Sequence, residues 1–160
     1  MNDDEWNERA RGETPTERLD RNWASLLQEL RVMQTGIQLL TGFLLTLPFQ
    51  ARFAQISDRD VAIYLVTTTA SVAATILVVA PVAMHRILFR RHAVAILVRW
   101  ANRLAIAGLG LLAVAVIGVI TLIFDVVVDR GTGLVVGAVI AVVAITLWIA
   151  LPLVLRRRTT

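Results

Sequence analysis

Long runs of apolar residues alternate with short polar segments along this chain. Four of the runs reach the length of about 20 residues that an α-helix needs to cross a bilayer at a rise of 1.5 Å per residue. They cover residues 32–53, 61–84, 104–126 and 134–155. The outer turns between them contain the short polar sequences SDRD and DRGTG. The pattern predicts an all-α polytopic membrane protein with four transmembrane helices in two hairpins, spanning residues 32–155.

The segment ahead of the first run has a different pattern. Residues 1–13 are polar and are expected to form a disordered cytoplasmic tail. The sequence TPTE, from Thr14 to Glu17, has the residues of a capping box, with a proline at the first helical position. Apolar residues then follow at helical spacing: Leu19, Trp23, Leu26, Leu27 and Leu30. We therefore expect an amphipathic cytoplasmic helix over residues 14–31, which lies on the membrane surface or docks on another protein segment.

The composition supports a membrane protein, because 57% of the 160 residues are hydrophobic and the mean hydropathy is +0.70. All 16 basic residues are arginines, and the net charge is +4. The membrane hypothesis explains this charge better than nucleic-acid binding does. Thirteen arginines fall in the two terminal segments and the middle loop, and only Arg52, Arg59 and Arg130 fall in the outer turns. The positive-inside rule then predicts a multi-pass membrane protein with both termini in the cytoplasm, ending in a basic tail over residues 156–160.

The middle loop carries a basic cluster in the sequence HRILFRRH. Its arginines Arg86, Arg90 and Arg91 are candidates for contact with anionic lipid headgroups on the cytoplasmic side. The alternative is a simple stop-transfer anchor. No metal or cofactor is expected, because the chain has no cysteine and only two histidines. Hydrolase and nucleotide-binding motifs are absent from the sequence, so an enzyme is not expected.

The first run is polar along one side. At about 100° per residue, its polar and small residues fall within an arc of about 140°: Gln28, Arg31, Gln34, Thr35, Gln38, Thr41, Gly42 and Thr46. Lipid offers these groups no hydrogen bonds, so the arc must face other helices or a water-filled cavity. Gln34, Thr35, Gln38 and Thr41 are therefore candidates either for interhelical hydrogen bonds or for a polar path taken by an ion or small solute.

A coupled transporter normally needs an ionisable group inside the membrane. The two best candidates for such a gate are Asp125, near the outer end of the third run, and Glu29, near the cytoplasmic end of the first. Asp125 is alternatively an interfacial group that pairs with Arg130. Glu29 has Arg31 and Arg99 as candidate partners.

The elements LLQELR, QTG and LTGFLLTLPF, together with Pro81, His85 and Arg86, resemble an uncharacterised family of small bacterial multi-span membrane proteins. The resemblance covers roughly residues 22–91. Members are described as proteins with a domain of unknown function, and some carry an automatic label of sodium:proton antiporter. The resemblance implies a four-span, multi-pass protein of the bacterial inner membrane and no established activity.

Two functions are compatible with these features. The first is a non-enzymatic helical-bundle component that acts through a homo-oligomer or a membrane-protein partner. The second is a small ion or solute transporter or channel, with cation/proton antiport as one form, which uses the polar side of the first span.

Overall fold

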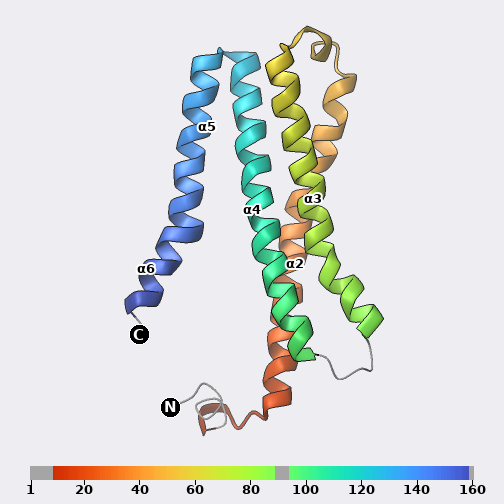
Figure 1. Cartoon of the computed structure of the whole chain (residues 1–160), viewed down its shortest axis with the longest axis vertical. Coiled ribbons are helices and arrows are strands. Elements are labelled where there is room, and N and C mark those ends of the chain that lie inside the picture. Colours follow the sequence, from red (N-terminus) through yellow and green to blue (C-terminus); the bar gives the residue numbers. More distant parts are fainter. Residues whose placement is uncertain (1–8, 89–93, 159–160) are drawn as a thin grey trace. The chain divides into compact units, whose positions relative to one another are not determined.

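A computed structural model describes residues 9–88 and 94–158, which are mostly helical and contain no strand (Figure 1). The long helices are α2 (Pro15–Thr46), α3 (Asp58–Leu88), α4 (Val94–Val127) and α5 (Arg130–Ile145). Two 3-10 turns, Leu47–Phe49 and Phe53–Gln55, connect α2 to α3. A π-helical turn, Thr146–Ala150, joins α5 to α6 (Leu151–Arg158). The prediction of an all-α fold is confirmed.

Four helical segments in the described residues are long and apolar enough to cross a membrane. They are Thr16–Phe49, Asp58–Ile87, Ile96–Val127 and Arg130–Arg157. Each of the four predicted spans falls largely within one of these segments. On length and composition, the chain is a multi-pass membrane protein.

The amphipathic segment and the first span form one continuous helix, α2. The capping box at its start is formed, because the backbone nitrogen and the Oγ1 of Thr14 both donate to Oε2 of Glu17 at 2.8 Å. In return, the backbone nitrogen of Glu17 donates to the Thr14 hydroxyl at 3.3 Å. These bonds satisfy donors that the first turn of a helix otherwise leaves unpaired.

The described chain divides into two compact units, which are built from different parts of the same helices. Unit 1 comprises Met1–Gln38 and Ala74–Leu109, and unit 2 comprises Leu39–Ala73 and Gly110–Thr160. In unit 1, the rings of Trp23 and His85 stack with centroids 5.3 Å apart, which holds the start of α2 to the end of α3. The buried apolar residues of unit 1 are Leu30, Ile37, Ala74, Val78, Pro81, Leu97 and Ala101.

Buried positions recur every seven residues on the helices. On α2 they are Leu30, Ile37 and Leu44. On α3 Ala70 is also buried, and the other buried positions alternate at spacings of four and three: Asp60, Tyr64, Thr67, Ser71, Ala74, Val78 and Pro81. A seven-residue repeat keeps one side of a helix against its neighbours, as in left-handed helix packing. Asp60, Thr67 and Ser71 occupy repeat positions that are normally apolar.

Small residues permit close helix contacts in unit 2. A Cβ atom added at Gly118 of α4 would overlap Thr67 of α3, and one added at Gly137 of α5 would overlap Thr121 of α4. A buried cluster of Leu44, Tyr64, Val119 and Leu122 lies in the same unit. The Tyr64 hydroxyl donates to the backbone oxygen of Leu44 at 3.1 Å, which ties α3 to α2.

Replacement of Gly118 by alanine is therefore expected to destabilise the protein. The added methyl group must displace Thr67, which is 1% exposed, and such overpacking costs about 1–3 kcal/mol. Gly110→Ala is the matched control on the same helix, because nothing lies within 4 Å of its Cβ position. It should be neutral or should stabilise by up to about 1 kcal/mol through helix propensity. Unfolding in mixed micelles, followed by circular dichroism, measures both; equal stability of the two variants would contradict the close contact.

Candidate functional site

The polar residues of α2 lie mainly on the side opposite its buried residues. Ile37 is fully buried, whereas Arg31, Thr35 and Gln38 are exposed. At about 100° per residue, Thr35 lies about 160° from Ile37 around the helix. The exposed polar and small residues of this side form the α2 polar stripe: Gln28, Arg31, Thr35, Gln38, Gly42 and Thr46.

Two candidate residues at the edge of this stripe are half-buried, Gln34 and Thr41. The hydroxyl groups of Thr41 on α2 and Ser71 on α3 are hydrogen-bonded at 2.5 Å. This is an interhelical bond of the type expected for polar side chains in lipid. Thr35 instead donates to the backbone oxygen of Arg31 on its own helix, at 3.0 Å. The structure thus links Thr41 to a neighbouring helix and leaves Thr35 and Gln38 exposed.

The other predicted site residues belong to different units of the chain. Glu29 is exposed on α2 in unit 1, whereas Asp125 is buried on α4 in unit 2. Arg86 is exposed in the last turn of α3. Arg90 and Arg91 lie outside the described residues.

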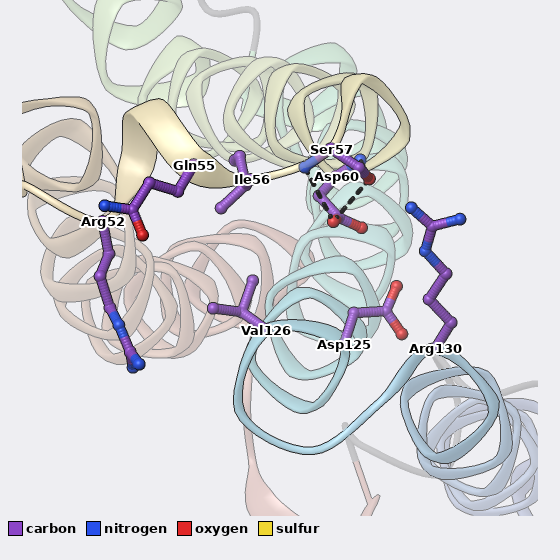
Figure 2. Close-up of a pocket in the computed structure, with 8 residues that line it drawn as sticks. All are labelled: Arg52, Gln55, Ile56, Ser57, Asp60, Asp125, Val126 and Arg130. Carbon is purple, nitrogen blue, oxygen red and sulfur yellow. Dashed lines mark hydrogen bonds between the residues drawn. The ribbon is translucent and has the colours of Figure 1, made fainter.

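A polar pocket of about 330 Å³ lies in unit 2 between the α2–α3 connection and the α4–α5 turn (Figure 2). The connection contributes one wall and the end of α4 with the start of α5 contributes the other. The lining residues are Arg52, Gln55, Ile56, Ser57, Asp60, Asp125, Val126 and Arg130. Two carboxyl groups and two guanidinium groups therefore share one small volume.

Asp60 enters the pocket from the first turn of α3. Its Oδ2 accepts from the Ser57 hydroxyl at 2.7 Å and from the Ser57 backbone nitrogen at 3.3 Å, and the Ser57 hydroxyl accepts from the Asp60 backbone nitrogen. This capping box fixes the carboxyl group in place. The residue is 6% exposed, and its Oδ1 is buried without a hydrogen-bond partner.

Asp125 reaches the same pocket from the last turns of α4, and its side chain is fully buried. Both of its carboxyl oxygens lack a hydrogen-bond partner. Its Oδ2 lies 3.5 Å from Nη1 of Arg59, which makes a long ion pair. A Cβ at Gly133 of α5 would overlap the Asp125 carboxyl group and would lie 2.8 Å from the backbone oxygen of Thr121. Only a glycine therefore lets α5 pack over this carboxyl group.

The turn after Asp125 is held by Asp129, the N-cap of α5. Its Oδ1 accepts from the Thr132 backbone nitrogen at 2.9 Å, and its Oδ2 accepts from the Thr132 hydroxyl at 2.9 Å. These bonds favour the charged form, so they hold the pKa of Asp129 below its ordinary value. A charged cap fixes the start of α5 and with it the position of Arg130.

The model of a family of unknown function (DUF6328) matches residues 12–152. The chain belongs to this family. The match covers most of the chain, including three of the four segments that are long enough to cross a membrane and most of the fourth, Arg130–Arg157. Searches of curated proteins and of solved structures found no match. The family description assigns no activity.

Asp60 and Arg59 were not predicted as site residues, because the SDRD sequence that contains them indicates only a polar turn. Two signals pointed to Asp60: the capping-box spacing from Ser57, and its place at the start of the seven-residue repeat of α3. The ion pair of Asp125 is formed with Arg59, while Arg130, the partner considered from sequence, lines the same pocket. Among the described residues, no group of three or more histidine, cysteine or acidic side chains is placed to hold a metal ion.

The bond between Thr41 and Ser71 is expected to contribute to the stability of the protein. In a double-mutant cycle of Thr41→Val and Ser71→Ala, we expect a coupling free energy of about 0.5–1.5 kcal/mol. The measurement is unfolding in mixed micelles. Thr35→Val, which loses only a bond within its own helix, is the control and should show no coupling with Ser71→Ala. A coupling of zero for Thr41 would contradict the interhelical bond.

Proposed function

We propose that the protein is a non-enzymatic membrane component that assembles with a second copy of itself through the α2 polar stripe. The observation that carries this proposal is the exposure of Gln38, Thr35 and Gly42 on the side of α2 opposite its buried residues. In the middle of an apolar span, an uncovered amide is unfavourable by several kcal/mol, since lipid has no hydrogen-bonding groups. Another helix must therefore cover this stripe.

The chemistry of the stripe suits a second copy. The Gln38 amide carries both donors and acceptors, so two identical amides can satisfy each other across a twofold axis. An axis along the membrane normal brings the same depth of each copy together, so Gln38 would meet Gln38 and Gly42 would meet Gly42.

Helix contact is sterically open on this side of α2. A Cβ atom at Gly42 would have nothing within 4 Å of it, so the protein itself does not occupy the space beside this glycine. Small residues at such positions let two helix backbones approach closely in a membrane. The neighbouring Leu39, which is 74% exposed, and Phe43, which is 50% exposed, supply apolar contact area beside the polar groups.

The assembly is expected to weaken when the stripe is altered. Gln38→Leu removes the amide pair and Gly42→Leu blocks close approach, so each should raise the dimer dissociation constant about 3- to 30-fold. Gln50→Leu and Gly110→Leu are matched controls, because both positions are exposed and lie off the stripe. Energy transfer between labelled copies in liposomes measures the dissociation constant.

Three results would contradict this proposal. One is a strictly monomeric wild-type protein at high protein-to-lipid ratio, and another is an equal effect of the stripe and control variants. The third is a different membrane protein that co-purifies with the wild type and is lost with Gln38→Leu, which would assign the stripe to a partner of another kind.

We propose further that both termini face the cytoplasm of a bacterial inner membrane. The support is the arginine distribution, with Arg52, Arg59 and Arg130 as the only basic residues in the outer turns. The chain has no cysteine, so single cysteines placed at Gly131 and at Thr160 report their side without background. An impermeant maleimide added to intact spheroplasts should label the Gly131→Cys protein and spare the Thr160→Cys protein. The reverse pattern would overturn the orientation.

A further inference from the structure

The Asp60 and Asp125 carboxyl groups interact directly with each other in unit 2, where α3 begins and α4 ends. The Asp125 side chain is fully buried, and Asp60 is 6% exposed. Three of the four carboxyl oxygens lack a hydrogen-bond partner: Oδ1 of Asp60 and both oxygens of Asp125. An ionised carboxyl group only accepts hydrogen bonds, so two such groups in contact need a donor between them.

Charged groups approach this pair from each neighbouring element. Arg59 on α3 places its Nη1 3.5 Å from Oδ2 of Asp125, a longer distance than the roughly 2.7–2.9 Å of a charge-assisted hydrogen bond. Arg130 at the start of α5 and Arg52 on the α2–α3 connection line the adjoining pocket, and both are exposed (Figure 2). Asp129, the N-cap of α5, adds a negative charge. Water screens exposed cations, so they offset little of the repulsion between two buried carboxylates in contact.

We propose that Asp60 and Asp125 form a proton-binding site, in which the two carboxyl groups share one proton at neutral pH. With the proton on Asp125, its O–H donates to the Asp60 carboxyl group. Asp60 stays ionised, because Ser57 donates to its Oδ2 through the hydroxyl at 2.7 Å and through the backbone nitrogen at 3.3 Å. A single proton thereby supplies the missing donor and removes one of two like charges, as in other carboxyl pairs held in contact.

The packing around the pair restricts its ligand to a proton. Gly133 of α5 lies so close that even a Cβ atom at this position would overlap the Asp125 carboxyl group. The adjoining polar pocket of about 330 Å³ is lined by both acids and by the exposed Arg52 and Arg130, so water reaches the edge of the pair and exchanges its proton. Loss of this proton leaves two negative charges in contact and weakens the link between α3 and α4.

The shared proton couples the stability of the fold to pH. In the unfolded chain, each of the two carboxyl groups ionises near the ordinary aspartate pKa of about 3.9. The folded protein therefore binds one more proton than the unfolded chain at neutral pH, and its stability falls as the pH rises. One proton corresponds to a change of up to about tenfold per pH unit in the unfolding equilibrium constant.

Infrared spectroscopy detects the proton directly. The wild-type full chain, purified in a detergent without ester groups, should show the C=O stretching band of a protonated carboxyl group at neutral pH, and the band should shift in heavy water. Asp125→Asn and Asp60→Asn should each abolish it, because the remaining carboxyl group gains an amide N–H donor and stays ionised. Asp58→Asn, at an exposed residue off the pocket, is the matched control and should retain the band. No band in the wild type, or a band that persists in either folded pair variant, would overturn the proposal.

Unfolding in mixed micelles between about pH 5 and pH 8 distinguishes a shared proton from an ionised Asp125 that is simply paired with Arg59. With a shared proton, Asp125→Asn should be at least as stable as the wild type at the upper end of this range. It should also lose the pair's contribution to the pH dependence, up to about tenfold per pH unit, which Asp58→Asn should keep. The proposal fails if Asp125→Asn is less stable than the wild type throughout or has the same pH dependence. If Asp125→Asn does not fold, the infrared band of the wild type and its loss in Asp60→Asn decide.

Discussion

Lipid offers no hydrogen bonds, and this constraint determines where polar side chains are stable on apolar helices. The protein satisfies this constraint in three ways. Thr67 and Thr121 donate to backbone oxygens of their own helices, at 2.7 and 2.8 Å. Thr41 pairs with Ser71 on a neighbouring helix. The α2 polar stripe is the third case: its threonines Thr35 and Thr46 donate to backbone oxygens of α2, whereas the Gln38 amide is exposed, and we propose that a helix from outside the chain covers it.

Glycine makes the buried polar groups possible. Gly133 and Gly137 lie one turn apart on α5, and they leave room for Asp125 and Thr121, which lie one turn apart on α4. Gly118 does the same for Thr67. Close packing of backbone against polar side chain excludes lipid from these groups without an apolar cover. The same arrangement places Asp125 at the pocket. The helix packing in unit 2 and its candidate site therefore depend on the same glycines.

The sequence was sufficient for the four spans and the all-α class, because hydropathy over about 20 residues is a local property that the bilayer imposes. The polar side of α2 was also visible in the sequence, since helical periodicity fixes which residues share a side. Whether this polar side faces the neighbouring helices or points away from them was not visible in the sequence. Ile37 is buried and Gln38 is exposed because of the side of α2 that the neighbouring helices cover. Asp60 and Arg59 were missed for a similar reason: their meeting with Asp125 joins residues that are distant in sequence, and neither α3 nor α4 alone indicates it.

The central claim is that the outward side of α2 contacts another α2. Oxidative cross-linking in native membranes tests it most directly, because the chain has no cysteine of its own and a disulfide needs Cα atoms within about 7 Å. With Gly42→Cys, we expect a disulfide-linked dimer on a non-reducing gel. With Gly110→Cys, at an exposed glycine on α4, we expect none. A monomer for Gly42→Cys, or equal dimer for both variants, would contradict the claim.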